Sequence, residues 1–381
     1  SQKGKGTVIV TATTEDGGFT ATQTVNVGYN LPSTVIDKGK CGYGAYWTLY
    51  SDGKLYISGE GNINDFEQSY YNSSYDTPWY FYRENINTVK ISNDITRIGD
   101  YAFCDCANIT SITIQNSVTS IGYAVFANCE SLTNITIPNS VKSIGECAFK
   151  DCKNLSNISI PDSVINIGDC AFGGTKWFEN QNDGIVYAGK VAYEYKGIID
   201  ETEKLIFKND TVGIADHSFN NALSLAEVII PNNVEYIGDY AFYNSEIKSL
   251  SIGNNVKIIG DHAFAGCYLA NVTIPDKVIT IGKSAFSDCA FTNITIPNNV
   301  EIIESSAFNG CIKLRTINIG NSVISIGEDA FRGCENLKEV KLGNNIKYIG
   351  PQAFFNCSKI ENIVLPDSIT YIGDSAFEYL Y

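Results

Sequence analysis

Hydrophobic residues recur along most of this chain with a period of about 23 residues. The repeated unit reads V-x-x-I-G-x-x-A-F-x-x-C-x-x-L-x-x-I-x-I-P, as in "SVKSIGECAFKDCKNLSNISIPD" at 140–162. A fixed period of this length predicts one small structural unit stacked on copies of itself. The phenylalanines of the A-F pair stand 22 or 23 residues apart, with one gap of 47, and are Phe103, Phe126, Phe149, Phe172, Phe219, Phe242, Phe264, Phe286, Phe308, Phe331, Phe354 and Phe377.

Two segments of the unit predict different local structures. The I-x-I segment has period two and β-branched residues, so it predicts a short strand with both isoleucines on one face, as at Ile135 and Ile137. The A-F-x-x-C-x-x-L segment spaces its apolar residues by three, which predicts a short helical or 3₁₀ turn on the opposite side of the coil. Because one unit cannot enclose its own apolar side chains, we expect the stacked coils to share one continuous core.

The recurring motif "IGxxAFxxCxxLxxIxIPxSV" resembles the BspA-like class of bacterial leucine-rich repeats. The resemblance covers about 98–381 and implies an α/β leucine-rich-repeat solenoid that is rich in short parallel strands joined by 3₁₀ or helical turns. Residues 41–97, which include "CGYGAYWTLYSDGKLYISGEGNINDF", are similar to the N-terminal cap that often precedes such arrays. The resemblance also implies a secreted or surface-anchored bacterial protein used for adhesion, which the periodicity itself does not show.

The first 30 residues differ from the repeats in composition. Two alternating runs flank Asp16-Gly17 and predict a β-hairpin. The segment 1–30 resembles the last two strands of a bacterial Ig-like domain, and residues 31–40 follow as a linker.

One coil carries an insertion. The gap between Phe172 and Phe219 exceeds the usual 23 residues by 24. Within the inserted segment, at about 174–204, "DGIVYAGKVAYEYKG" alternates around Ala188-Gly189 and predicts a second hairpin. Its aromatic residues either pack the hairpin onto the flank of the solenoid or form a ligand-binding, sugar-stacking surface. They are Trp177, Phe178, Tyr187, Tyr193 and Tyr195.

The charge of the chain excludes some classes of partner. A formal net charge of −15 and a pI near 4.6 argue against nucleic acid, which requires a basic face, and against electrostatic docking on anionic lipid. No apolar run approaches the ~20 residues that span a bilayer. The chain begins at Ser1, with neither a methionine nor a signal peptide, so we interpret it as a mature or trimmed product.

Residues that could support catalysis or bind a metal are few. The two histidines, His217 and His262, lie two residues before a repeat phenylalanine, where other coils carry unrelated residue types. They stand two coils apart and are too few to bind zinc. The sequence offers no paired carboxylates in a concave site. We therefore expect no catalytic residue, no metal site and no cofactor.

Ten of the twelve cysteines occupy two fixed positions of the repeat. Other coils place Thr175, Ala222 or Ser245 at the main cysteine position, which indicates a slot for a small, buried, weakly polar side chain. Cys147 and Cys170 occupy a more exposed slot one coil apart and are the better candidates for a disulfide. The cysteines of the main slot stand three residues after the phenylalanine and are Cys106, Cys129, Cys152, Cys267, Cys289, Cys311, Cys334 and Cys357.

Alternation along the I-x-I strand predicts which residues face solvent. The residue inside I-x-I and the residue before the first isoleucine point outward, and in most coils they are short hydroxyl or amide side chains. Such residues suit an exposed strand and help pairing, or else they recognise an extended protein or glycan through many weak contacts. The candidate binding residues on this face are Asn134, Thr136, Asn157, Ser159, Asn271, Thr273, Asn293 and Thr295.

From these observations we expect a non-enzymatic, monomeric bacterial protein outside the cell. It would mediate adhesion by binding a host or bacterial surface protein or glycan across the solenoid. One alternative is an architectural spacer that carries another surface domain. The other is a carbohydrate-active enzyme or an accessory carbohydrate-binding module, with the aromatic insertion as its sugar platform.

Overall fold

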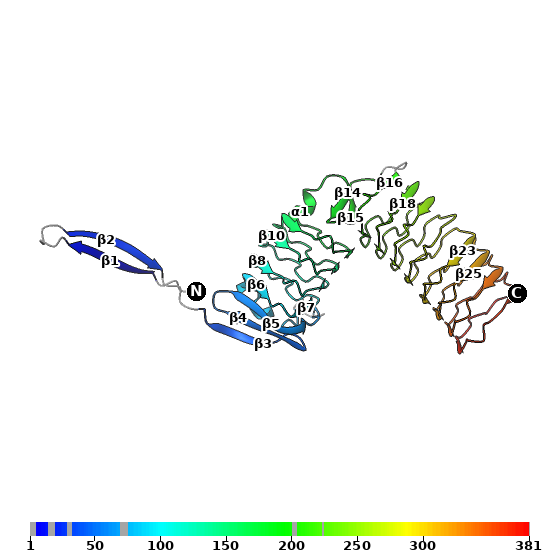
Figure 1. Cartoon of the computed structure of the whole chain (residues 1–381), viewed down its shortest axis with the longest axis horizontal. Coiled ribbons are helices and arrows are strands. Elements are labelled where there is room, and N and C mark those ends of the chain that lie inside the picture. The colour runs from blue at the N-terminus through cyan, green and yellow to red at the C-terminus, as the bar shows by residue number, and fades with distance from the viewer. Residues whose placement is uncertain are drawn as a thin grey trace.

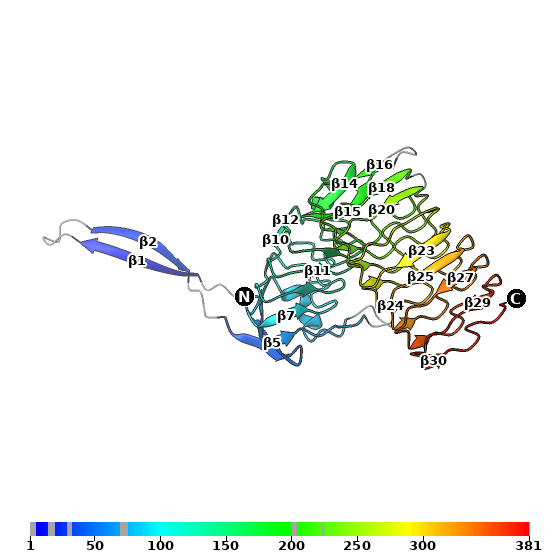
Figure 2. The ribbon, with the colours of Figure 1, turned by 45° about the vertical axis from the view of Figure 1, so that its right-hand side comes forward.

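The computed structural model describes residues 5–13, 20–28, 33–68, 75–199, 204–222 and 225–380, with the backbone alone for the first two ranges. The repeats form an arch of stacked coils, and its two limbs meet near β14 (Gly184–Ala188) and β15 (Val191–Lys196) (Figures 1 and 2). Most coils add one rung to each of two parallel ladders and one turn to a flank. The leucine-rich-repeat solenoid that we expected is confirmed.

The first ladder runs through the x-I pair before the repeat glycine, a strand that the sequence analysis did not predict. Neighbouring coils pair parallel and in register, as Ile144 does with Ile121 and Ile167, and these isoleucines are fully buried in nearly every coil. The rungs are β7 (Ile95–Ile98), β9 (Ser120–Ile121), β11 (Ser143–Ile144), β13 (Asn166–Ile167), β17 (Gly213–Ile214), β19 (Tyr236–Ile237), β21 (Ile258–Ile259), β22 (Thr280–Ile281), β24 (Ile302–Ile303), β26 (Ser325–Ile326), β28 (Tyr348–Ile349) and β30 (Tyr371–Ile372).

The second ladder is the predicted I-x-I strand, and it lies on the outer side of the arch (Figure 1). It is divided into separate short sheets, and residues 270–275 form no strand. The first ladder is divided once, between β13 and β17, because β17 pairs with β15 of the inserted hairpin. The strands are β6 (Thr88–Ile91), β8 (Ser111–Thr113), β10 (Asn134–Thr136), β12 (Asn157–Ser159), β16 (Lys204–Ile206), β18 (Glu227–Ile229), β20 (Ser249–Ser251), β23 (Asn293–Ile296), β25 (Thr316–Ile319), β27 (Glu339–Lys341) and β29 (Asn362–Ile363).

The A-F-x-x-C-x-x-L segment forms consecutive hydrogen-bonded turns instead of the helical turn that its spacing predicts. In the coil of Phe149, the residues two before and two after the phenylalanine, Cys147 and Asp151, have φ of 56° and 58°. Left-handed residues interrupt a right-handed helix. The amide of Phe149 donates to the Ala171 carbonyl of the next coil at 2.8 Å, whereas the amide of Cys152 donates within the coil to Phe149 at 3.2 Å. Alternate amides thus bond between coils and within a coil, which satisfies the backbone without a helix.

The repeat phenylalanines stack ring on ring inside the flank. Phe103, Phe126, Phe149 and Phe172 form one stack with centroids 5.2–5.6 Å apart. A second stack runs from Phe219 to Phe377 with similar spacing. All but the last are buried, so the predicted continuous core is confirmed, with one interruption between Phe172 and Phe219.

The N-terminal end of the array is covered by an antiparallel sheet of β3 (Val35–Lys40), β4 (Gly44–Tyr50) and β5 (Lys54–Asn62). β5 pairs parallel with β6 through its first residues and with β7 through Gly61 and Asn62, so one strand closes both ladders. The 3₁₀ helix η1 (Tyr80–Asn85) follows Trp79, which stacks on Phe103 at 5.5 Å. The cap thus supplies the first aromatic rung.

At the N-terminus, β1 (Lys5–Thr13) and β2 (Thr20–Gly28) pair antiparallel, from Lys5 with Gly28 to Thr13 with Thr20. This confirms the predicted hairpin. Its Asp16-Gly17 turn lies outside the described residues.

All twelve cysteines are free thiols, including Cys147 and Cys170, so the possible disulfide between these two is not formed. In the main slot, the thiol donates a hydrogen bond to the carbonyl of the phenylalanine one coil earlier, as Cys129 does to Phe103 at 3.3 Å. Ser245 replaces a cysteine and makes the same bond to Phe219 at 2.9 Å. The slot is therefore small and buried, as predicted, and in most coils its side chain also donates a hydrogen bond, although Ala222 has no donor there.

Candidate functional site

The predicted solvent-facing residues of the I-x-I ladder form a polar ribbon along the outer side of the arch. All eight candidates are exposed: Asn134, Thr136, Asn157, Ser159, Asn271, Thr273, Asn293 and Thr295. Those on β10 and β12 are register partners, Asn271 and Thr273 lie in the segment 270–275 that forms no strand, and those on β23 follow it. The structure thus brings the predicted residues onto one surface in two groups, one on each limb.

Local hydrogen bonds orient the ribbon amides. Asn134 donates to the Thr133 hydroxyl at 3.2 Å, and Asn293 donates to the Thr292 hydroxyl at 3.1 Å. Threonines and serines of β8, β10 and β12 line a shallow hollow of about 390 Å³ beside Asn116 and Asn139. These groups offer many neutral donors and acceptors, which suit an extended partner better than a reactive centre.

Between the two polar groups the ribbon changes character. On β16 and β18, Ile206 and Ile229 are register partners and are 73% and 41% exposed. Lys204 and Glu227 form an ion pair at 2.8 Å beside them. Neither isoleucine is among the candidate binding residues that the sequence analysis names. Ile206 lies between the inward-facing Leu205 and Phe207, so the alternation of the strand could have predicted that it is exposed.

The aromatic residues of the insertion pack against the solenoid, which was the first of the two interpretations. Tyr193 is 2% exposed, and its ring contacts Phe172, Trp177 and Phe178. Its hydroxyl accepts a hydrogen bond from the Phe172 amide at 3.0 Å. Phe172 donates here to a side chain because the next regular turn is missing. Trp177, Phe178, Tyr187 and Tyr195 are partly buried against the core.

The insertion hairpin, β14 and β15, is a wedge in the array. The Ala215 amide, next to β17, donates to Ala192 of β15 at 2.9 Å, in the way that Gly122 donates to Ile98 in a regular coil. The next amide, Asp216, donates instead to Ile167 of β13 at 3.1 Å. The coil of β17 thus meets both the hairpin and the regular coil before it. This double contact lies where the two limbs of the arch meet (Figure 1).

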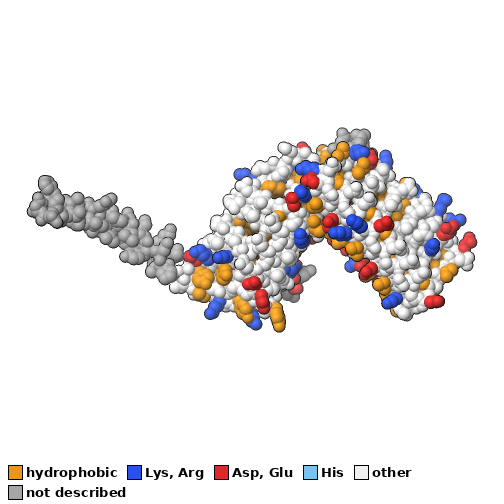
Figure 3. Space-filling model, in the orientation of Figure 1, with side chains coloured by type: hydrophobic (Ala, Val, Ile, Leu, Met, Phe, Trp, Pro, Cys, Tyr) orange, Lys and Arg blue, Asp and Glu red, His pale blue; other side chains and the backbone are white. Residues whose placement is uncertain are grey.

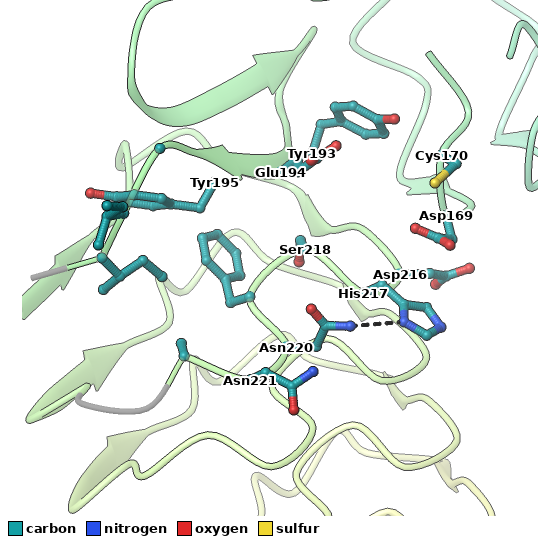
Figure 4. A pocket seen from close by; sticks show the side chains of 15 residues that line it. Asp169, Cys170, Tyr193, Glu194, Tyr195, Asp216, His217, Ser218, Asn220 and Asn221 are labelled. Carbon is teal, nitrogen blue, oxygen red and sulfur yellow. Dashed lines mark hydrogen bonds between the residues drawn. The ribbon is translucent and has the colours of Figure 1, made fainter. Parts of the chain in front are cut away.

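The wedge leaves a hollow of about 470 Å³ where one phenylalanine turn is absent, which we call the wedge pocket (Figure 4). Three segments line it: the turn after β13, the end of β15 and the residues that follow, and the turn after β17. Figure 4 shows Asp169, Asp216 and His217 close together on one side, with Asn220 beside His217 and Asn221 next to Asn220. Sequence reasoning named only Tyr193 and Tyr195 of this lining as candidate binding residues.

The wedge disturbs a regular column of acidic residues. An aspartate directly after the repeat glycine accepts the amide of the next coil, as Asp239 does from Asp261 at 2.7 Å, and Asp216, which follows Ala215 instead of a glycine, accepts from Asp239 at 2.9 Å. Asp169 occupies the same place, but the Asp216 amide donates to Ile167 instead. Within the described residues, Asp169 therefore lacks the backbone donor that its equivalents have.

Burial raises the pKa of acids around the pocket. Desolvation and then the Asp239 carboxylate raise the pKa of Asp216 to about 7. Desolvation and then Asp169 raise the pKa of Glu194 above its usual value. The pocket thus brings together Asp169, Glu194 and Asp216, and within the described residues none of these carboxyl groups forms an ion pair.

The polar groups beside these acids are engaged with the protein. The Ser218 hydroxyl donates to the Ala215 carbonyl at 2.8 Å, and His217 Nδ1 contacts the Asn220 amide at 3.1 Å. Among the described residues, no group of three or more His, Cys, Asp or Glu side chains is arranged to hold a metal ion. The arrangement is suited to binding a hydrogen-bond donor or a positively charged group.

Comparisons with known proteins agree with the repeat. The family model described as "BspA type Leucine rich repeat region" matches residues 78–183, 192–268 and 257–381. No curated protein matches the chain. The matches begin at residue 78, so the resemblance of residues 1–30 to an Ig-like domain stays a prediction.

Several solved structures are similar to this chain. A leucine-rich repeat protein from Eubacterium ventriosum is 27% identical, with 90% of this chain and 94% of that chain covered and a TM-score of 0.44. One from Bacteroides ovatus is 22% identical, with 92% of each chain covered and a TM-score of 0.37. A leucine-rich cell surface protein from Faecalibacterium prausnitzii is 23% identical, with 87% and 94% covered and a TM-score of 0.32.

Proposed function

Since the chain belongs to the BspA-type leucine-rich repeat family, we propose that it is a non-enzymatic bacterial surface protein that binds a protein or glycan through its solenoid. The polar ribbon is the observation that carries this proposal. It extends over both limbs of the arch, and its exposed hydroxyl and amide groups can each contribute a weak hydrogen bond to a long partner. Affinity would come from area and from repeated contacts.

The wider surface supports a binding role. The face of the arch that Figure 3 shows carries Lys and Arg side chains interspersed with Asp and Glu and with isolated apolar side chains. At the apex, Ile206 and Ile229 add an apolar contact between the two polar groups of the ribbon. Interfaces that combine an apolar centre with a polar rim are typical of protein recognition. None of the helices in the described part of the chain is long and apolar enough to span a membrane.

A binding panel tests the proposal. The purified protein is applied to immobilised matrix proteins, mucins and a glycan array. The ribbon is disrupted by Thr136→Arg together with Thr295→Arg, one substitution on each limb. The matched control is Thr119→Arg, an exposed threonine outside the ribbon. We expect at least one partner to bind the wild-type and control proteins and to bind the double variant about tenfold more weakly.

Other results would contradict the proposal. If the double variant binds as tightly as the wild type, the ribbon does not take part in binding. If the wild type binds nothing in the panel, the architectural spacer is favoured. Deleting the whole insertion is not a useful control, because the hairpin buries Val186, Ala188, Val191, Ala192 and Tyr193 in the core. Point substitutions on the surface avoid this loss of stability.

A further inference from the structure

We propose that the wedge pocket receives the side chain of an arginine or lysine from a basic segment of a partner protein. This inference rests on the proposed binding function and names the chemistry of one subsite. It assigns to the insertion a role other than the sugar-stacking one that its aromatic residues first suggest.

The inner wall of the pocket suits a positively charged head group. Asp169 and Glu194 face the same hollow, and Asp216 lies beside Asp169 (Figure 4). Within the described residues, none of these three carboxyl groups forms an ion pair with Lys, Arg or His. The side-chain carboxyl of Glu194 also has no hydrogen-bond partner there. Carboxylates that are partly desolvated and close together gain most from a cation that replaces the missing partner.

The remaining walls suit an aliphatic stem. Ile198 stands at the pocket with 93% of its surface exposed, and Ile199 and Phe219 line the same hollow. Arginine and lysine carry an apolar stem below a charged head, so an apolar mouth above an acidic floor matches both parts. A volume of about 470 Å³ lies within the range of pockets that bind small groups. An exposed isoleucine at the mouth also fits a protein partner whose surface would cover it.

Other ligand chemistries fit less well. Of the two insertion tyrosines that line the pocket, Tyr193 is 2% exposed and Tyr195 is partly buried against the core, which leaves little ring surface on which a sugar could stack. The described residues place no metal-binding group here. A net charge of −15 would also attract a basic partner over distance. An arginine-bearing or lysine-bearing protein is therefore the occupant that these features favour.

Small probes test the subsite directly. Argininamide and citrullinamide differ in the charge of the head group and are titrated into the full chain by NMR or calorimetry. We expect argininamide to bind with a dissociation constant on the order of 1 mM, as for a small ligand. Glu194→Gln and Asp169→Asn should each weaken this binding about tenfold. The control is Glu328→Gln, which removes an exposed acid that follows the repeat glycine in a distant coil.

Each outcome decides the question. Equal binding of citrullinamide would overturn the proposal, as would equal loss in Glu328→Gln or no binding of argininamide to the wild type. Melting temperatures of the two variants near the wild-type value show that they fold. If argininamide binds but the macromolecular panel is silent, the subsite stands and the proposed function fails. If a partner binds but argininamide does not, the function stands and this inference fails.

Discussion

At the scale of single residues, each coil depends on two left-handed backbone positions. In the described coils, the residues two before and two after the repeat phenylalanine have φ between 47° and 73°. The second position holds Asp, Asn or Gly in eleven of twelve coils, which are the residues that tolerate this region. The first position holds residues as different as Cys147, His217 and Gln352. Its conformation could not be predicted from residue type, because contacts between coils impose it.

A first prediction concerns the second left-handed position. Asn356 has φ of 56°. Asn356→Gly should change the free energy of unfolding by less than about 0.5 kcal/mol, because glycine adopts this conformation without strain. Asn356→Val should cost about 2 kcal/mol, because a β-branched residue is strained there. Chemical denaturation measures both. Equal stability of the valine and glycine variants would contradict the left-handed assignment.

A second prediction concerns the thiol slot. Cys311 donates to the Phe286 carbonyl at 3.2 Å, in the way that Ser245 donates to Phe219. Cys311→Ser should therefore cost less than about 1 kcal/mol, whereas Cys311→Val should cost about 2 kcal/mol because the buried carbonyl loses its donor. Thermal unfolding compares the two variants. A serine variant less stable than the valine variant would show that the slot selects apolar volume alone.

At the scale of elements, the length of a strand decided what could be predicted. The I-x-I strand has a full alternation, so Ile135 and Ile137 were correctly placed inside and Asn134 and Thr136 outside. The x-I rungs are mostly two residues long and carry no periodic signal, so the first ladder was missed. The flank was predicted as helical from its spacing of three, and consecutive turns produce the same spacing. The wedge pocket could not be predicted, because it depends on which backbone amides of the following coil bond to the hairpin and which bond to the regular coil before it.

A third prediction follows from the acid at the wedge. Burial raises the pKa of Asp216 to about 7 in the folded protein, above the value of about 3.9 for an unperturbed aspartate. The group therefore contributes stability below pH 4, and this contribution is lost as the pH rises through 7. Asp216→Asn removes the ionisation, and its oxygen can still accept from the Asp239 amide.

The measurement is the free energy of unfolding of both proteins between pH 4 and pH 8. We expect Asp216→Asn to equal the wild type near pH 4 and to exceed it by on the order of 2 kcal/mol at pH 8. A constant difference across this range would show that Asp216 is not held above its usual pKa.

A fourth prediction tests the junction of the hairpin with the regular coil. The Tyr193 hydroxyl accepts the buried amide of Phe172 at 3.0 Å. Tyr193→Phe leaves this amide without a partner and should cost about 1–3 kcal/mol. The control Tyr268→Phe changes a tyrosine that is 65% exposed and should cost nothing measurable. Equal melting temperatures of Tyr193→Phe and the wild type would mean that the Tyr193 hydroxyl does not stabilise the fold by accepting the Phe172 amide.

At the scale of the whole molecule, the repeat predicted a stack of coils and the structure adds its shape. The interior is two phenylalanine stacks, which end at Phe172 and begin again at Phe219, with the hairpin wedged between them. The period of 23 residues does not encode the arch, because its bend lies at the one irregular coil (Figure 2). The polar ribbon follows the outer side across this bend, so one partner would meet both limbs.

The central claim is that each coil has an interior only through its neighbours. The most direct measurement is amide hydrogen exchange of Phe242→Ala against the wild type, with Tyr268→Ala as an exposed control. Removing this buried ring should cost about 3–5 kcal/mol, and coils that share a core should lose protection together. We predict faster exchange at Phe219 and Phe264, in the flanking coils, as well as at position 242. Loss of protection confined to the coil of residue 242 would contradict the account.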